Sequence, residues 1–384
     1  MKSIFTKLAV VLTSFIFITA CDENEPAPDN STTEVLENYA NLVYANYDDV
    51  VKTAQSLSTA IDDFTTAPTT TNLEKARKAW LAARSAYGQT EGFRFYGGPI
   101  DNDEGPEGLI NGWPLDESYI DYVVGNPNSG IINDVVAYPA ITRDLLVSLN
   151  ENGSETNLST GYHAIEFLLW GQDFNADGPG DRPVTDYIAA QNTDRREQYL
   201  KVVTELLIDN LTEVREAWKL GAPYRTNFIA GEDDSIAKVF RGIGALSKGE
   251  LAGERMTVAL ANQDQEDEHS CFSDNTHEDI RMNFLSIKNV YMGTYQRVDG
   301  SIVSGKSLAD LVKAKNAEKN TAVQTLLKSV ESSVYAIPVP FDKAISNGDP
   351  SKNIEKSILG LRRLSDSIVD AALSLGIQVN ADLD

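Results

Sequence analysis

Only three histidines occur in the chain, and His163 stands in a setting that suits metal chemistry. It lies three residues before Glu166 within the segment Gly-Tyr-His-Ala-Ile-Glu-Phe-Leu-Leu-Trp. On a helix, residues three apart share a face, so the imidazole and the carboxylate can bind one ion together. The apolar residues that follow predict a buried helix, in which a Glu166 carboxylate needs a metal ion or an arginine as a partner. The alternative is a histidine and a glutamate that only hydrogen-bond each other.

A second cluster of metal-ligating residue types spans residues 266–279. It holds two histidines eight residues apart, one cysteine and six carboxylates. Its candidates for further ligands are His269, His277, Glu268 and Asp274. An equally open interpretation is structural: Asp274 or Thr276 caps a helix that His277 opens, and Glu278 and Asp279 favour its dipole. Cys271 is expected to be a buried thiol.

The segment Asp173-Phe174-Asn175-Ala176-Asp177-Gly178 matches the opening of a calcium-binding EF-hand loop. That loop needs a bidentate glutamate at its twelfth position, where this chain has Val184. Gly178-Pro179-Gly180 is typical of an ordinary turn, and we do not expect this segment to bind calcium.

The elements that must position these residues are helices. Apolar residues recur three and four apart in long segments, whereas sustained strand alternation is missing. The expected helices span residues 34–64, 73–91, 133–150, 160–170, 194–219, 234–262, 277–295, 307–335 and 351–375, with a short one near 117–124. Residues 92–131 are rich in Gly, Pro, Asp and Asn and predict a long irregular excursion.

The helix pattern predicts an all-α fold of two tandem antiparallel bundles. A long amphipathic segment stops at Gly221-Ala222-Pro223, so we expect an N-terminal bundle over residues 34–220 and a C-terminal bundle over 221–384.

The N-terminus has the layout of an export signal. Two lysines precede an apolar run that ends in Ile-Thr-Ala-Cys. This apolar run is too short to span a bilayer comfortably. Residues 1–20 are interpreted as a lipoprotein signal peptide and Cys21 as the lipidated residue, followed by a flexible acidic tether over 21–33. We expect an exported protein at the outer membrane or cell surface, held by its lipid.

The net charge limits which molecules the chain can bind, and the cysteine content limits its disulfide bonds. The formal net charge of −24 repels nucleic acid and favours cations near the surface. With Cys21 lipidated, Cys271 has no partner for an intrachain disulfide.

Several blocks together resemble the imelysin-like family of insulin-cleaving metallopeptidases and iron-regulated proteins. The first is Gly-x-His-Ala-Ile-Glu-Phe-Leu-Leu-Trp-Gly-Gln-Asp. The others are Trp80-x-x-Ala83-Arg84-x-x-Tyr87-x-x-Thr90-Glu91, Trp113-Pro114-Leu115-Asp116, Leu251-Ala252-Gly253-Glu254-Arg255-Met256 and the segment around His269 and His277. The acidic residues behind Cys21 are similar to the export signal of Bacteroidetes lipoproteins.

The resemblance implies two helical bundles with a metal site in the cleft between them. Carried over by position, the ligands would be His163, Glu166, Glu91 and Asp101, a set that suits one divalent or ferric ion such as Fe, Zn or Mn. The implied function is a membrane-anchored protein that binds a metal ion or an iron-containing ligand in metal acquisition, with a protein partner in the uptake system.

Two other functions stay open. A zinc peptidase would use Glu166, with Arg84 or Arg255 as the oxyanion donor, but the chain lacks a His-Glu-x-x-His motif. A surface interaction module would instead use aromatic residues such as those of the segment Phe93-Arg94-Phe95-Tyr96.

Overall fold

A computed structural model describes residues 31–175 and 178–383, and within that range the chain is all-α as expected. Residues from Ser31 onward form one compact unit. The signal peptide, Cys21 and nearly all of the expected tether lie outside the described residues. None of the helices in the described part combines the length and apolarity that crossing a bilayer requires.

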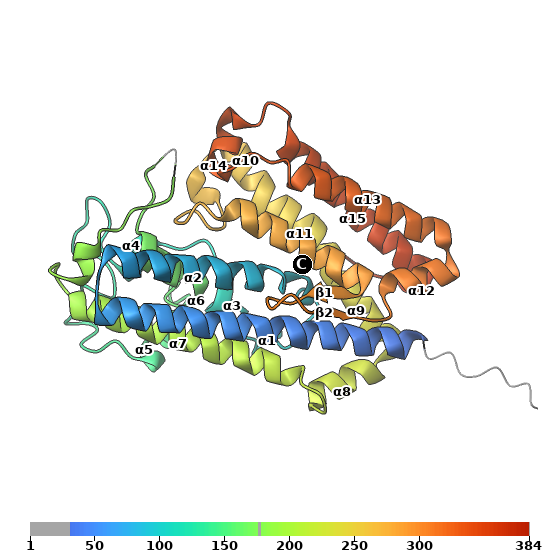
Figure 1. Ribbon diagram of the computed structural model, residues 1–384, viewed down its shortest axis with the longest axis horizontal. Coiled ribbons are helices and arrows are strands. Elements are labelled where there is room, and N and C mark those ends of the chain that lie inside the picture. Colours follow the sequence, from blue (N-terminus) through green and yellow to red (C-terminus); the bar gives the residue numbers. More distant parts are fainter. Residues whose placement is uncertain (1–30, 176–177, 384) are drawn as a thin grey trace, which may run out of the picture. The chain divides into compact units, whose positions relative to one another are not determined.

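The elements up to the predicted boundary near residue 220 are mostly α-helices (Figure 1). They are α1 (Ser31–Thr66), α2 (Thr70–Gly88), η1 (Glu91–Phe93), α3 (Glu107–Asn111), α4 (Glu117–Ile120), α5 (Arg143–Leu149), α6 (Gly161–Trp170), η2 (Val184–Tyr187) and α7 (Thr193–Ala217).

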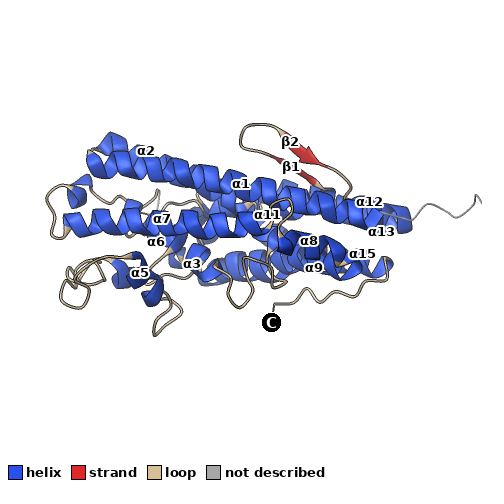
Figure 2. Cartoon of the chain, turned by 90° about the horizontal axis from the view of Figure 1, so that it is seen from below, coloured by secondary structure: helices blue, strands red, loops and turns tan. Residues whose placement is uncertain are grey.

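The elements after that boundary include one short hairpin, which lies beside α1 (Figure 2). They are α8 (Pro223–Ala230), α9 (Glu232–Ala245), the π-helix η3 (Leu246–Thr257), α10 (Val258–Asn262), η4 (Gln265–Asp267), α11 (Thr276–Met292), β1 (Thr294–Gln296), β2 (Ile302–Ser304), α12 (Leu308–Lys315), α13 (Ala317–Val334), α14 (Phe341–Lys343), the π-helix η5 (Ala344–Gly348) and α15 (Asn353–Ser374). The two strands pair antiparallel.

The long helices pack through the apolar stripes that the sequence predicts. In α1 the predicted stripe is buried from Val35 through Val50 to Ile61, and it packs against α2 and α7. In α2 the buried side chains include Trp80 and Tyr87. Because α1 also contacts α8 and α9, this core continues past the predicted bundle boundary. The division into two bundles stays a prediction.

Helix α6 is buried on every side, since each of its ten residues is buried. It begins at Gly161 and ends before Gly171, and both glycines have positive φ angles of 85° and 72°. A Cβ at residue 161 would lie 2.5 Å from the carbonyl oxygen of Ile110 at the end of α3, so only glycine fits this close approach. The sequence prediction for this helix is confirmed, and α6 holds His163 and Glu166 inside the core.

Three predicted helices differ in the structure. The helix expected over 133–150 begins only at Arg143, because Pro139 cannot sit in a helix interior. The helix expected over 307–335 breaks at Asn316, whose side chain caps α13 by accepting from the backbone N–H of Lys319. The helix expected over 234–262 changes to π geometry between Leu246 and Thr257. Such segments commonly occur at functional sites.

Candidate functional site

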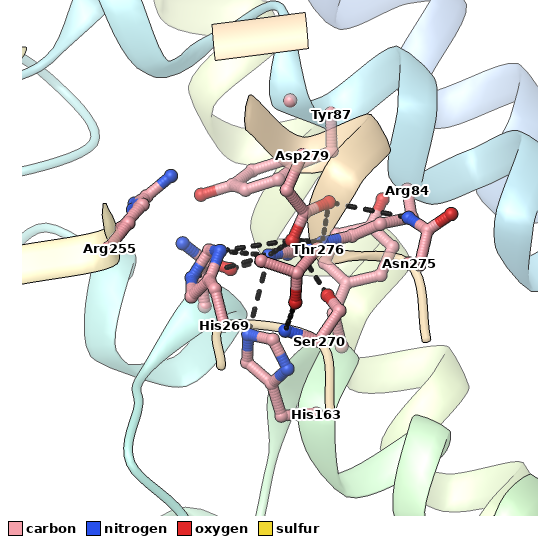
Figure 3. A network of polar contacts seen from close by, with 12 residues as sticks. Arg84, Tyr87, His163, Arg255, His269, Ser270, Asn275, Thr276 and Asp279 are labelled. Carbon is pink, nitrogen blue, oxygen red and sulfur yellow. Dashed lines mark hydrogen bonds and ion pairs between the residues drawn. The ribbon is translucent and has the colours of Figure 1, made fainter. Parts of the chain in front are cut away.

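A buried polar network joins α2, α6, α11 and the loop before α11 (Figure 3). Arg84 comes from α2, His163 from α6, His269 from the loop and Asp279 from the first turns of α11. The side chains of all four are buried. Residues far apart in the sequence therefore meet at one point that contains two of the three histidines.

Glu166 holds the imidazole of His163 in place. Nδ1 of His163 lies 2.9 Å from Oε2 of Glu166, and Oε1 of Glu166 accepts hydrogen bonds from the backbone N–H and the hydroxyl of Ser273 at 3.0 and 2.6 Å. Burial raises the pKa of Glu166 to about 8, although Ser273 and Arg84 act in the opposite direction. Both oxygens of the Glu166 carboxyl group thus have hydrogen-bond partners.

Arg84 determines which nitrogen of His163 carries the proton. A guanidinium can only donate, and its Nη2 lies 3.4 Å from Nε2 of His163. We therefore assign the lone pair to Nε2 and the proton to Nδ1, which faces Glu166. Burial, with Arg84 and His269 adding to it, holds the pKa of His163 well below its usual value. The ring is neutral, which is the form that binds metal ions.

His269 lies against the same guanidinium from the other side. Its ring centroid is 4.9 Å from that of His163, and Nη2 of Arg84 is 3.0 Å from its Nδ1 and 3.3 Å from its Nε2. Oδ2 of Asp279 lies 3.0 Å from Nδ1 of His269. Burial, together with Arg255 and Arg84, lowers the pKa of His269 to about 4, although Asp279 acts in the opposite direction. This second imidazole is also neutral near pH 7.

Asp279 supplies the negative charge of the network. Its carboxylate accepts from Nε and Nη2 of Arg84 at 3.1 and 3.0 Å and from the hydroxyl of Ser270 at 2.7 Å. Burial alone would raise the pKa of Asp279, but Arg84 and His269 hold it well below its usual value. Arg84 and Asp279 therefore form a buried ion pair in which the two opposite charges balance each other.

A second ion-pair group lies next to the first and surrounds Glu91. Its Oε2 accepts from Nη1 of Arg94 at 2.8 Å and from Nη2 of Arg255 at 2.7 Å. Burial opposes ionisation, but these two arginines lower the pKa of Glu91 to about 2. Asn111 links the two groups, since it accepts from Nη1 of Arg84 at 2.5 Å and donates to Oε1 of Glu91 at 3.5 Å.

A cavity of about 530 Å³ opens beside this network, with His269 in its wall. Arg94 and Arg255 also line it, and Trp113 lies between the cavity and His163, its ring centroid 4.9 Å from that of the histidine. The acidic lining residues are Glu107, Glu151, Glu155, Glu250, Glu254, Glu266 and Asp267. Solvent therefore reaches one of the two imidazoles through a strongly acidic opening.

The structure brings some of the predicted ligands together and separates others. His163, Glu166 and His269 share one network, and Glu91 reaches it through Asn111. Asp101 instead accepts from the backbone N–H groups of Phe95 and Gly98 and lines another cavity, of about 580 Å³. Within residues 31–175 and 178–383, no three His, Cys, Asp or Glu side chains are placed to hold one metal ion. The four-residue ligand set stays a prediction.

The remaining candidates from the second cluster lie elsewhere. His277 is half-buried at the start of α11, and its Nδ1 has no hydrogen-bond partner in the described structure. Glu268 and Asp274 are buried among other carboxylates. Cys271 is a buried free thiol, as expected.

Three side chains that make key contacts in and around this network are not indicated as such by the sequence. The sequence indicates Asp279 only as a charge that favours the helix dipole, whereas its carboxylate pairs with Arg84 and His269. Asn111 and Ser273 had no motif of their own, because each acts through a contact that only folding creates. A buried arginine on the apolar face of α2 was the available signal, since it required a carboxylate partner.

Comparison with known proteins agrees with this architecture. The family model described as Imelysin matches residues 43–368. A curated relative from Synechococcus elongatus named Iron-regulated protein A is 25% identical over 367 residues, which cover 93% of this chain and 89% of the relative. A crystal structure from Parabacteroides distasonis, provisionally described as an iron-regulated protein A precursor, has a TM-score of 0.71 at 19% identity and covers 92% of this chain and 97% of that one. The chain therefore belongs to the imelysin family.

Proposed function

We propose that this protein binds a transition-metal ion at His163 and His269 and contributes to iron acquisition. The observation that carries the proposal is that two neutral, buried imidazoles lie side by side next to an acid-lined cavity. Their ring centroids are 4.9 Å apart. Imidazole nitrogen with nearby carboxylates suits Fe, Zn and Mn. The names of the relatives, which refer to iron regulation, favour iron among these metals.

The chemistry of the His163 side chain supports a ligand role. Metal-binding histidines usually donate their second N–H to a carboxylate, which fixes the ring and raises its basicity. Nδ1 of His163 faces Glu166 in this way, and its Nε2 is left with the lone pair. In this proposal Glu166 orients His163 and need not contact the ion itself.

Arg84 opposes the binding of any cation here. Its Nη2 lies within hydrogen-bond distance of Nε2 of His163 and of Nε2 of His269, the nitrogens that would bind a metal ion. The ion must therefore compete with a positive charge that Asp279 already neutralises. Such competition weakens binding, as an uptake protein that later releases its metal requires.

The acidic walls of the cavity support the same function. Carboxylates gathered around a concave opening raise the local concentration of cations and increase their rate of arrival. The side chains of Glu250 and Glu266 lie among them, on the π-helix and on η4. The cavity would thus guide the ion toward His269.

We further propose that the protein is exported and anchored through a lipid on Cys21, at the outer membrane or cell surface. Its N-terminal sequence has the layout of a lipoprotein signal. The description of the structural relative as a precursor agrees with export. In this location the protein would pass its metal to a partner in an uptake system.

Calorimetric titration of the mature chain with Zn²⁺, Mn²⁺ and Fe³⁺ tests the proposal. We expect one ion per chain for wild type and loss of binding when His163→Ala is combined with Glu166→Ala. The matched control is His277→Ala, which removes a histidine outside the network and should bind normally. Unchanged binding in the double variant would reject the site.

The zinc peptidase is a second candidate because the pKa of Glu166, about 8, lies in the range that suits a general acid or base. A peptidase would cleave a peptide panel in a chelator-sensitive manner and lose this activity in Glu166→Gln. The metal carrier is favoured because Glu166 already accepts from His163 and Ser273.

A further inference from the structure

In the described part of the chain, the imidazole of His163 has polar or ring contacts with four side chains. Three of them are held in turn by hydrogen bonds or ion pairs to other buried side chains, namely Arg84, Glu166 and His269. The fourth is Trp113, whose ring centroid lies 4.9 Å from that of His163 at an interplanar angle of 55°. Trp113 thus differs from the other three neighbours in how it is fixed.

Packing alone holds the indole of Trp113. Its ring contacts those of His269 and Phe272, with centroid distances of 6.5 and 6.0 Å. Its N–H makes no hydrogen bond with the described residues, whereas the indole N–H of Trp80 donates to the carbonyl of Tyr162 at 3.0 Å. Trp113 is also only half-buried, while Trp80 is fully buried. The indole of Trp113 can therefore change its rotamer without losing a hydrogen bond.

Trp113 stands where the acid-lined cavity ends and the buried histidine begins. Trp113 and His269 both line this cavity, whereas His163 does not line it and is only 1% exposed. The cavity, of about 530 Å³, has room for an ion with its hydration shell, since one water takes up about 30 Å³ in the liquid. An ion in the cavity therefore reaches His269 directly but meets the indole before it reaches His163.

The charged neighbours of His163 are poorly suited to open the site. Withdrawing Arg84 would separate it from Asp279, and breaking such a pair leaves an uncompensated charge in the core. Withdrawing Glu166 would leave the hydroxyl of Ser273 without its acceptor. Turning the indole aside costs only packing contacts, so the site opens most easily at Trp113.

We propose that Trp113 gates the passage of the metal ion from the cavity to His163. This inference rests on the function proposed above, in which one ion binds both imidazoles. Binding then takes two steps, because the ion first binds His269 and can bind His163 only after the indole has turned aside. Release requires the same movement. Trp113 therefore controls how fast the metal ion exchanges and not how tightly it is held.

Stopped-flow mixing of the mature chain with Co²⁺, a coloured substitute for Zn²⁺, tests the gate. For wild type we expect a slow phase whose rate becomes independent of the Co²⁺ concentration, because the movement of the indole limits it. In Trp113→Ala this phase should be about tenfold faster, which corresponds to a barrier lower by about 1.4 kcal/mol. Release of Co²⁺ into EDTA should accelerate by a similar factor, so that the affinity measured by calorimetry stays nearly unchanged.

Two further variants separate a gate from a damaged fold. Trp113→Phe keeps a smaller aromatic ring and should give rates between those of wild type and Trp113→Ala, and it carries the test if circular dichroism shows that Trp113→Ala does not fold. Val258→Ala is the matched control, since it removes bulk from another part of the cavity wall and should exchange Co²⁺ like wild type. Equal acceleration in Val258→Ala and the Trp113 variants would indicate general loosening and would overturn the proposal.

The outcomes also distinguish the gate from the metal site itself. If wild type binds one ion but the Trp113 variants exchange it at the wild-type rate, the gate is rejected and the metal site stands. A wild-type rate that rises with Co²⁺ concentration without reaching a limit would have the same meaning. A wild type that binds no ion would overturn both proposals.

Discussion

Nδ1 of His163 lies 2.9 Å from Oε2 of Glu166, one turn further along the fully buried helix α6. This contact fixes the tautomer of the imidazole and directs its Nε2 toward Arg84 and His269. The function proposed here depends on that orientation, because a ring turned the other way would offer the guanidinium an N–H instead of a lone pair.

Glu166→Gln should weaken metal binding while the protein stays folded. The amide keeps the shape of the side chain but is a poorer acceptor for Nδ1–H, and loss of such a supporting carboxylate typically lowers metal affinity about 10–100-fold. Calorimetric titration measures the change. Glu213→Gln, at an exposed position of α7, is the matched control. Equal affinities in the two variants would contradict the role of Glu166.

Arg84→Met should destabilise the fold strongly. It leaves the Asp279 carboxylate buried without its main partner, and breaking a buried ion pair typically costs about 3–5 kcal/mol. Adding Asp279→Leu removes the unpaired charge and should recover much of the loss. Urea unfolding of the three variants forms the double-mutant cycle. If the changes in the free energy of unfolding of the two single variants simply add up in the double variant, the side chains of Arg84 and Asp279 do not stabilise each other.

The stability of the protein should fall on acidification in a way that depends on His269. Its pKa is about 4 when folded and about 6.5 when unfolded, so the unfolded chain binds more protons between these values. Stability is therefore lost as the pH falls from 6.5 to 4, by roughly 3 kcal/mol for this group. Between pH 6.5 and pH 4, the free energy of unfolding should therefore fall more steeply with decreasing pH for wild type than for His269→Gln. Parallel curves would mean that His269 is not held neutral.

Gly161→Ala should disturb the start of α6. Its φ angle is positive, and the added Cβ would meet the carbonyl of Ile110 at 2.5 Å, so we expect a loss above about 2 kcal/mol. Gly153 also has a positive φ, but its nearest atom lies 3.7 Å away. Gly153→Ala should therefore cost only about 1 kcal/mol. Chemical denaturation compares the two, and equal losses would contradict the close approach of α3 and α6.

Local patterns predicted the helices whose apolar faces are regular, as in α1, α2 and α6. They failed where a single residue overrode the pattern, as Pro139 did before α5, and where the helix changed its hydrogen bonding, as in η3. The spacing of His163 and Glu166 predicted their contact because the two lie on one helix. The pairing of Arg84 with Asp279 joins residues 195 positions apart, and no helical period encodes such a contact. The resemblance to a family supplied Glu91 and Asp101, of which the fold brings only Glu91 near the histidines.

X-ray absorption spectroscopy of the metal-loaded mature chain tests the central claim most directly, because it reports how many imidazoles bind the ion. The account predicts one ion per chain with two imidazole ligands, and one imidazole fewer in His163→Ala and in His269→Ala. An ion coordinated only by oxygen, or a spectrum unchanged in both variants, would contradict it.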